Sequence, residues 1–197
     1  MEITAKMVKE LRDKTGAGMM DCKSALAEAK GDFERAATLL REKGIAKAGT
    51  KSGRETSEGI ITSYIHPGDK LGVLVEIACE TDFVARTESF RTFARDIAMH
   101  VAASAPLCVK REDINPELVA KEREIYRKQA ENEGKPAKII DKIVDGKIEK
   151  YYAEIVLMEQ PFVKDNDKTI GDYVKEMIGS LGENIVIKRF VRFRLGE

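Results

Sequence analysis

The sequence predicts an α+β fold, in which an N-terminal bundle of three short helices precedes a core that combines a small antiparallel sheet with helices and a long helical hairpin. Three patterns support this prediction. Apolar residues recur at helical spacing over residues 1–45, they alternate with a period of two over 59–77 and 185–195, and two long helical stripes joined by a short turn occupy about 115–158. With 197 residues, the chain is long enough for one sizeable domain and one small one.

Residues 1–45 are predicted to form the helical bundle. Thr4 and Asp32 are suited to cap its first and third helices, and Gly31 is suited to end the second. The third helix is predicted to stop before Gly44, where the apolar periodicity is lost. Three brief helices with tight glycine turns would make a compact bundle that is too small to be very stable alone.

Residues 46–58 are predicted to be a linker between this bundle and a core domain over residues 59–197. The linker segment contains Gly49 and Gly53 among Lys, Arg, Ser and Thr residues and has no periodic apolar pattern. The core would begin with a β-hairpin around the turn signal His-Pro-Gly-Asp at 66–69. A C-terminal strand with apolar odd positions is predicted to join this hairpin in one antiparallel sheet with helices on one face.

Two long helices are predicted over about 115–158. Asn115 followed by Pro116 is a typical helix start, and Gly134 with Pro136 separates the two helices. Such a helical hairpin must bury its apolar stripe, either on its own sheet or against a second copy of the protein.

The segment Thr81-Asp82-Phe83-Val84 lies between a predicted strand and a predicted helix. Thr81 is the expected N-cap, and Asp82 lies in the first turn, where the helix dipole favours a negative charge. Phe83 has two interpretations. It lies seven residues before Phe90 and so fits the core stripe, which the pattern alone favours, but it could instead be an aromatic anchor for a partner protein.

The composition argues against several classes of function. Lys and Arg together number 34, as do Asp and Glu, so the net charge is zero, whereas a dedicated nucleic-acid binder needs a basic excess. No apolar run approaches membrane-spanning length, and the N-terminus lacks the pattern of a signal peptide. The chain is therefore expected to be a soluble cytoplasmic protein that binds neither nucleic acid nor a membrane.

Residues that could carry out catalysis or hold a metal are sparse. Cys22, Cys79 and Cys108 are widely spaced and form no C-x-x-C pair, which favours reduced, buried thiols over a zinc site or a disulfide. His66 and His100 have no acid or nucleophile at motif spacing. The sequence therefore predicts no catalytic residue, no metal and no cofactor, and it indicates a protein-binding molecule rather than an enzyme.

Basic and aromatic residues alternate near the C-terminus, in a pattern that can stack on single-stranded RNA. Strand alternation accounts for the same pattern, because it places Lys188, Arg192 and Arg194 on one face and Val191 and Phe193 on the other. The zero net charge favours the structural interpretation.

Four segments resemble the signatures of one protein family and occur in the same order. They are residues 15–23, 81–84, 159–165 and 182–185. Through them the chain resembles bacterial translation elongation factor Ts over essentially its whole length. The length is similar to that of the short form, which lacks the duplicated core half of longer members.

The resemblance implies a guanine nucleotide exchange factor for elongation factor Tu, which binds the GDP-bound and nucleotide-free forms of that GTPase and promotes GDP release. In this family an Asp-Phe pair, here Asp82 and Phe83 between Thr81 and Val84, places its phenyl ring between helices of the GTPase near the magnesium site. The resemblance also implies that the N-terminal bundle is of ubiquitin-associated type and docks on the GTPase domain. Carried over to this sequence, that docking surface consists of Val8, Leu11, Arg12, Met19, Met20 and Lys23.

The resemblance further implies a homodimer, to which either the helical hairpin or the C-terminal strand could contribute. No cysteine follows Cys108, so a disulfide through the C-terminal strand is excluded and any dimer is expected to be non-covalent. Two alternatives to the exchange factor stay open. One is an RNA-binding translation accessory protein that uses the bundle and the basic strand, and the other is a bundle that only tethers partners, which would not need Phe83.

Overall fold

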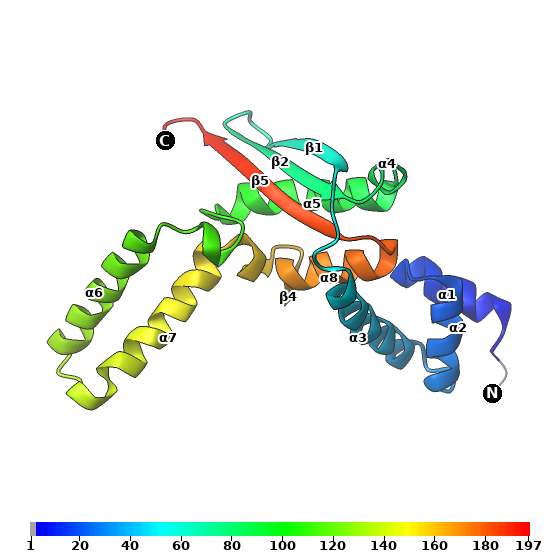
Figure 1. Ribbon diagram of the computed structural model, residues 1–197, viewed down its shortest axis with the longest axis horizontal. Coiled ribbons are helices and arrows are strands. Elements are labelled where there is room, and N and C mark those ends of the chain that lie inside the picture. The colour runs from blue at the N-terminus through cyan, green and yellow to red at the C-terminus, as the bar shows by residue number, and fades with distance from the viewer. Residues whose placement is uncertain (1–2) are drawn as a thin grey trace. The chain divides into compact units, whose positions relative to one another are not determined.

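The computed structural model describes residues 3–197, of which residues 45–47 are described by their backbone alone (Figure 1). Contacts divide the chain into two compact units. The first unit consists of Met1–Thr62, Val75–Asp96 and Asp172–Lys188, and the second of Ser63–Leu74, Ile97–Gly171 and Arg189–Glu197. The elements are mostly helices together with a small antiparallel sheet, which confirms the predicted α+β class.

Three helices open the first unit: α1 (Ala5–Thr15), α2 (Met19–Glu28) and α3 (Phe33–Lys51). The Thr4 hydroxyl accepts a hydrogen bond from the Met7 N–H at 3.3 Å, and the Asp32 carboxylate accepts one from the Arg35 N–H at 3.0 Å. Both predicted caps are therefore confirmed, and they satisfy amide groups that a helix N-terminus leaves unpaired. Gly16 follows α1 in the left-handed region, with φ of 68°.

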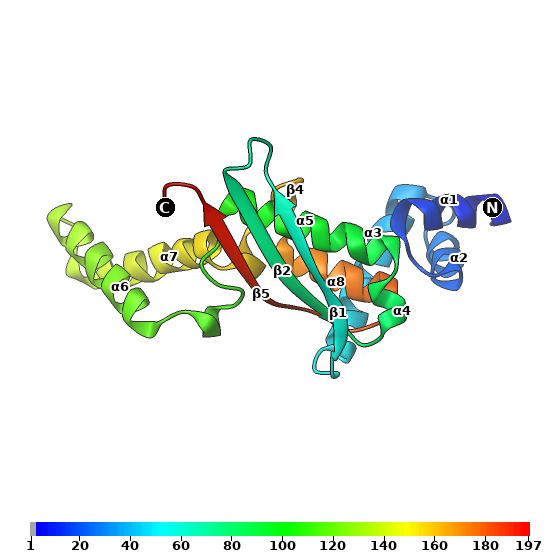
Figure 2. The same cartoon turned by 90° about the horizontal axis from the view of Figure 1, so that it is seen from above.

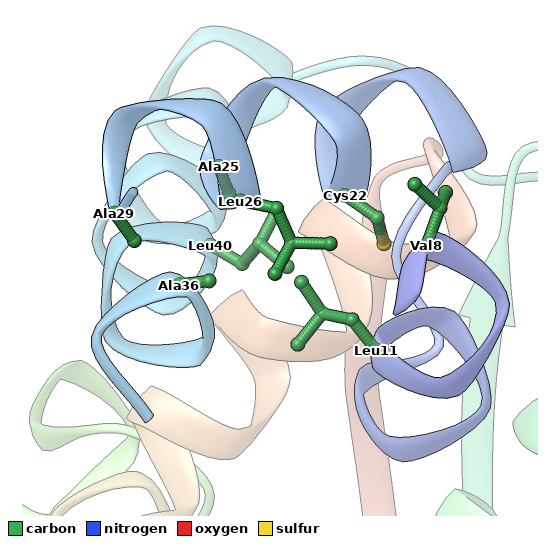
Figure 3. Close-up of a cluster of buried hydrophobic side chains, with 8 residues drawn as sticks. All are labelled: Val8, Leu11, Cys22, Ala25, Leu26, Ala29, Ala36 and Leu40. Atoms are coloured by element: carbon green, nitrogen blue, oxygen red, sulfur yellow. The ribbon is translucent and has the colours of Figure 1, made fainter. Parts of the chain in front are cut away.

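Apolar side chains from all three helices meet in one small core, which Figure 3 shows from close by. Its buried members are Val8, Leu11, Cys22, Ala25, Leu26, Ala29, Ala36 and Leu40. Five of these eight are alanine, cysteine or valine, so the three helices can approach one another closely and the core stays small. This agrees with a bundle that gains most of its stability from packing rather than from helix propensity.

The third helix does not stop before Gly44, as the sequence pattern predicted, but continues to Lys51. The first half of the predicted linker 46–58 is therefore helical, and only residues 52–57 lie between α3 and the first strand. Gly44 is a packing residue rather than a stop, because a Cβ built on it would lie 3.9 Å from the Cα of Gly179. A helix tolerates an internal glycine at a cost of about 1 kcal/mol, which close packing can offset. The division into a bundle over 1–45 and a core domain over 59–197 stays a prediction.

The sheet has the strand order β1–β2–β5, with β1 (Glu58–Ile65), β2 (Leu71–Cys79) and β5 (Ile185–Arg194). A tight turn connects β1 and β2, in which the His66 N–H donates to the Leu71 carbonyl at 2.9 Å. In β2 the side chains of Val73, Val75 and Ile77 are buried, whereas Leu74 is exposed. The predicted hairpin and the predicted third strand are thus both present.

The apolar odd positions predicted for the C-terminal strand are buried only at the start of β5. Ile185 and Ile187 are buried, but the alternation changes phase after them, and Phe193 is 68% exposed. Arg192 instead turns inward, where its Nε donates to the carbonyl of Ala102 at 3.5 Å. The carbonyl groups that end a helix carry partial negative charge and favour a cation there. In the last part of β5, Val191 and Phe193 are therefore exposed to solvent.

The apolar pattern predicts a single helix from about residue 82 to 103, but the structure has two, α4 (Asp82–Ala85) and α5 (Glu88–Ser104). Thr87 separates them. Its hydroxyl donates to the Val84 carbonyl at 2.8 Å and accepts from the Phe90 N–H at 3.2 Å, so it ends one helix and caps the next. The first unit is completed by residues of α8 (Ile170–Leu181).

The second unit contains the predicted helical hairpin, formed by α6 (Pro116–Asn132) and α7 (Ala137–Ile155), which run side by side in Figures 1 and 2. Ala130, Ile140, Val144 and Ile148 form its buried core. The two helices therefore bury part of their apolar stripes against each other. The unit also includes short elements: η1 (Arg111–Asp113), η2 (Leu157–Glu159), β3 (Pro161–Phe162) and β4 (Asp165–Thr169).

Candidate functional site

The turn formed by Thr81, Asp82, Phe83 and Val84 lies where β2 ends and α4 begins. Thr81 has extended backbone angles, and its hydroxyl accepts a hydrogen bond from the Val84 N–H at 3.4 Å, so its predicted capping role is confirmed. The Asp82 carboxylate lies in the first turn and pairs with Arg86 at 2.8 Å. The structure therefore brings the four predicted residues together in one rigidly hydrogen-bonded corner.

Phe83 is 79% exposed, which excludes the core interpretation and leaves the anchor as a prediction. The prediction that it forms the top layer of the core was wrong, because the break at Thr87 takes α4 out of phase with the core stripe that begins at Phe90. Ala85 is the buried residue of α4 instead. Among the described large apolar residues that are exposed, Phe83 has the largest exposed fraction, and an exposed aromatic ring on a hydrogen-bonded turn suits an anchor for another protein.

The carboxylate of Glu183, which is distant in the sequence, accepts hydrogen bonds from residues of this turn. The Glu183 Oε2 atom accepts hydrogen bonds from the N–H groups of Glu80 and Thr81 at 3.2 and 3.0 Å, and its Oε1 atom accepts one from the Thr81 hydroxyl at 2.6 Å. In return, the Glu80 carboxylate accepts a hydrogen bond from the Asn184 N–H at 2.6 Å. Two segments, 80–81 and 183–184, are thus bound to each other reciprocally.

Cys79 contributes a further contact beneath the turn. Burial, reinforced by the nearby Glu183 carboxylate, raises the pKa of the Cys79 thiol to about 11. The thiol is therefore protonated at neutral pH, and its Sγ donates to the Thr81 carbonyl at 3.2 Å. Its role in the turn is structural, as a buried donor, rather than that of a nucleophile.

The predicted docking surface of the bundle is only partly on the surface. Met19 and Met20 are 54% and 76% exposed, and Arg12 and Lys23 are exposed as well. Met19, Met20 and Lys23 share one side of α2, since positions three and four apart are neighbours on a helix. Flexible methionine side chains suit an adaptable contact with a partner.

Val8 and Leu11 do not belong to that surface, which corrects their assignment as docking residues. Leu11 is fully buried and Val8 is 7% exposed, and Figure 3 shows both side chains turned into the bundle core. A side chain without exposed area cannot contact a partner unless the bundle rearranges. Their role is to hold α1 against α2 and α3.

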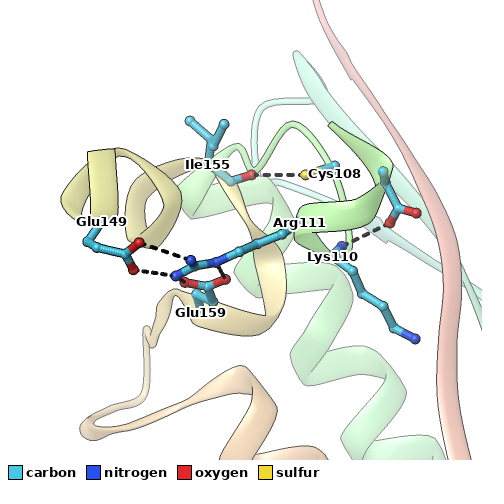
Figure 4. A network of polar contacts seen from close by, with 7 residues as sticks. Cys108, Lys110, Arg111, Glu149, Ile155 and Glu159 are labelled. Atoms are coloured by element: carbon cyan, nitrogen blue, oxygen red, sulfur yellow. Dashed lines mark hydrogen bonds and ion pairs between the residues drawn. The ribbon is translucent and has the colours of Figure 1, made fainter. Parts of the chain in front are cut away.

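Sequence analysis missed a polar cluster around Arg111, shown in Figure 4. Its guanidinium binds the Glu149 carboxylate at 2.7 and 3.1 Å, pairs also with Glu159, and lies 4.2 Å above the ring of Tyr152. These hydrogen bonds raise the pKa of Arg111 further above its ordinary value and lower the pKa of Glu149. The cluster joins η1 to α7 and η2, and its partners are too distant in the sequence for any local pattern to reveal them.

His100 is fully buried and has a partner for each ring nitrogen. Its Nδ1 accepts from the Val163 N–H at 3.2 Å, so Nε2 carries the proton and donates to the Gln160 side-chain oxygen at 2.9 Å. Burial lowers the pKa of His100 below its ordinary value, with a smaller opposing effect from the hydrogen bond to Gln160. A neutral imidazole with both nitrogens occupied is a structural group.

Among residues 3–197, no cluster of three or more His, Cys, Asp or Glu side chains is placed to hold a metal ion. Within the same part of the chain, no helix combines the length and the apolar character that crossing a membrane requires.

The arrangement defines a class of protein: a small α+β factor with an N-terminal three-helix bundle and an exposed aromatic residue on a braced turn. Residues 5–197 match the sequence model of a family described as Elongation factor TS. The chain belongs to the elongation factor Ts family.

Relatives over the full length support this assignment. The chain is 58% identical to elongation factor Ts of Coprothermobacter proteolyticus and 55% identical to that of Fervidobacterium nodosum, in each case over 100% of both chains. It is also 58% identical to elongation factor Ts of Carboxydothermus hydrogenoformans over 195 residues, which are 99% of this chain and 90% of the relative.

Proposed function

We propose that this chain is a guanine nucleotide exchange factor for elongation factor Tu and that it promotes GDP release during the elongation cycle in the cytoplasm. The observation that carries this proposal is the 79% exposure of Phe83 on a turn held by hydrogen bonds from both sides. Membership of the elongation factor Ts family supports the choice of partner.

The proposed mechanism needs no bond to be made or broken by this chain. Met19, Met20, Arg12 and Lys23 on the bundle would dock on the GTPase, while Phe83 would enter between its helices and displace the elements that hold magnesium. Since magnesium and the phosphate-binding loop retain GDP, their displacement weakens nucleotide binding. The factor binds the nucleotide-free GTPase more tightly than the GDP form, and by reciprocity GTP expels the factor.

Release of fluorescent GDP from elongation factor Tu tests this proposal. Phe83→Ala removes an aromatic anchor and should slow release at limiting factor by at least about 30-fold, or ~2 kcal/mol. Leu107→Ala is the matched control, because Leu107 is an apolar residue of similar exposure, 63%, outside the proposed site. Circular dichroism verifies that both variants are folded.

Each outcome decides between the alternatives. If the wild type accelerates release and Phe83→Ala does not, the anchor role stands. Equal acceleration by both would remove Phe83 from the mechanism. If the wild type itself has no effect, the exchange factor is the wrong function, and RNA binding becomes the next test.

We also propose that the chain forms a non-covalent homodimer through the open face of its sheet. In the second unit, Ile65 and Leu74 are 58% and 45% exposed, and Phe193 and Leu195 are 68% and 76% exposed. These side chains line one shallow apolar depression on β1, β2 and β5. A second copy presents the same apolar face, so a two-fold arrangement covers both at once.

A further inference from the structure

We propose that Glu183 is the positioning residue for the exposed Phe83, because its carboxylate sets the conformation of the turn from which that ring projects. This inference rests on the proposed function for its effect on nucleotide exchange, but its structural part can be tested on the chain alone. It assigns to Glu183 a role that is exerted through the turn rather than by contact with the partner.

The first step of the argument is that α4 cannot hold its own orientation. It has four residues, which is about one turn. An isolated turn of helix is unstable, because fixing its backbone angles costs more free energy than its first hydrogen bond contributes. Phe83 is 79% exposed, so its ring gains little from packing within the chain. The direction of the ring therefore depends on what fixes the start of α4.

The second step is that the Glu183 carboxylate fixes that start through three donors at once. It accepts the N–H groups of Glu80 and Thr81 at 3.2 and 3.0 Å and the Thr81 hydroxyl at 2.6 Å. Hydrogen bonds to an ionised acceptor are among the stronger ones in proteins. Each of the three groups belongs to the two residues that lead directly into α4.

The third step concerns the hydrogen of the Thr81 hydroxyl. A hydroxyl has one hydrogen to donate, and here that hydrogen points at Glu183. The oxygen is thereby left to accept from the Val84 N–H at 3.4 Å, which is the capping bond of α4. Glu183 thus determines that the Thr81 hydroxyl acts as the acceptor in the capping bond, and the two hydrogen bonds of this hydroxyl reinforce each other.

The position of Glu183 is itself secured. Its neighbour Asn184 is 4% exposed, its backbone N–H donates to the Glu80 carboxylate at 2.6 Å, and its side-chain amide donates to the Arg54 carbonyl at 2.8 Å. Arg54 in turn lies 3.6 Å from the Glu80 carboxylate. The turn is therefore preorganised before any partner binds, which lowers the cost of inserting the ring.

Glu183→Gln is the sharpest single change. The amide keeps the shape of the side chain but replaces one acceptor oxygen with an NH₂ group, which cannot accept from the N–H or O–H donors that face it. Glu176→Gln is the matched control, because Glu176 lies on α8, is 23% exposed at its side chain, and pairs at 2.8 Å with Arg41 rather than with the turn.

The first readout uses the free chain. The sequence contains no tryptophan, so Phe83→Trp introduces a single reporter at the ring position. Time-resolved fluorescence anisotropy should show a larger fast component in the Phe83→Trp, Glu183→Gln variant than in Phe83→Trp alone, and no change with Glu176→Gln. Unchanged ring motion in the Glu183→Gln variant would overturn the proposal.

The second readout is GDP release from elongation factor Tu at saturating factor. Glu183→Gln should slow release about tenfold, as expected for one lost charge-assisted hydrogen bond. In a Phe83→Ala background, Glu183→Gln should change the rate of GDP release by less than about twofold, because Glu183 acts through the ring that is already missing. Equal effects in both backgrounds would show a general structural role and overturn the positioning role.

A variant that does not fold is recognised by circular dichroism. In that case Glu183→Asp keeps the charge but withdraws the carboxylate from the Thr81 hydroxyl, and the same dependence on Phe83 is expected. If the ring becomes mobile but the wild type does not accelerate GDP release, the positioning role stands and the proposed exchange function fails.

Discussion

At the residue scale, the side-chain rings of Phe83 and His100 lie in opposite environments. Phe83 is 79% exposed, and its ring contributes little to the stability of the free chain. His100 is fully buried and binds Val163 and Gln160 through its two ring nitrogens. The first residue is the anchor that we propose for the partner, whereas the second ties α5 to the segment after η2.

His100 makes the stability of the chain depend on pH. Burial holds its pKa in the folded state below the ordinary value of 6.5, which applies to the unfolded chain. As the pH falls through 6.5, the unfolded state binds a proton that the folded state excludes, so the free energy of unfolding decreases on the acid side. Above that pH both states are neutral and the contribution of this group is constant.

Urea unfolding at pH 7.5 and 5.5 tests this prediction. The wild type should lose more stability between the two values than His100→Asn, whose side chain cannot be protonated in this range. His66→Asn is the matched control, since it removes the other imidazole of the chain from an exposed turn. Equal pH dependence in the wild type and His100→Asn would contradict the assignment.

At the scale of elements, glycines have opposite roles in two helices of similar length. In the first unit, Gly44 of α3 meets Gly179 of α8 so closely that a Cβ on Gly179 would lie 2.7 Å from the Cα of Gly44. In α7, a Cβ on Gly146 would have no heavy atom within 4 Å. The first glycine permits helix packing, and the second only weakens a helix.

The two corresponding alanine variants should therefore change stability in opposite directions. Gly179→Ala forces two backbones apart and should cost about 1–3 kcal/mol. Gly146→Ala should stabilise the chain by about 0.5–1 kcal/mol, because alanine is the better helix former. Thermal unfolding followed by circular dichroism measures both, and stabilisation by Gly179→Ala would show that α3 and α8 are not packed through their glycines.

At the scale of the whole molecule, two apolar surfaces are candidates for the contact of the proposed dimer. The open sheet face exposes Phe193 and Leu195, and the helical hairpin exposes Ile125 and Ile139 to 45% and 42%. The hairpin helices also carry charged side chains, and Arg127 of α6 pairs with Asp141 of α7 at 2.6 Å. On the sheet face, Phe193 and Leu195 line one depression together with Ile65 and Leu74, which is why we propose this face as the contact.

Sedimentation equilibrium on variants of each surface shows which of the two forms the dimer contact. Phe193→Asp places a charge in the proposed interface and should raise the dimer dissociation constant by at least about 30-fold, or ~2 kcal/mol. Ile125→Asp tests the hairpin and should leave the dissociation constant unchanged. The reverse result would move the contact to the hairpin, and a monomeric wild type would remove the dimer from the proposal.

Much of the local structure could be predicted from single patterns. Thr4, Asp32 and Thr81 cap helices as their side chains indicated, since capping involves residues only two or three positions apart. The predictions failed where a distant segment decides the outcome. Gly44 continues a helix because Gly179 packs against it, and Val8 and Leu11 are buried because three helices meet over them.

By itself, the sequence determined the α+β class, the bundle, the hairpin, the three strands and the segment of the candidate site, because periodicity and capping are local properties of the chain. Only the tertiary structure decided that Phe83 faces solvent, that Glu183 braces its turn and that Phe193 is uncovered. Exposure depends on what packs against a side chain, and those neighbours come from segments that lie far apart in the sequence.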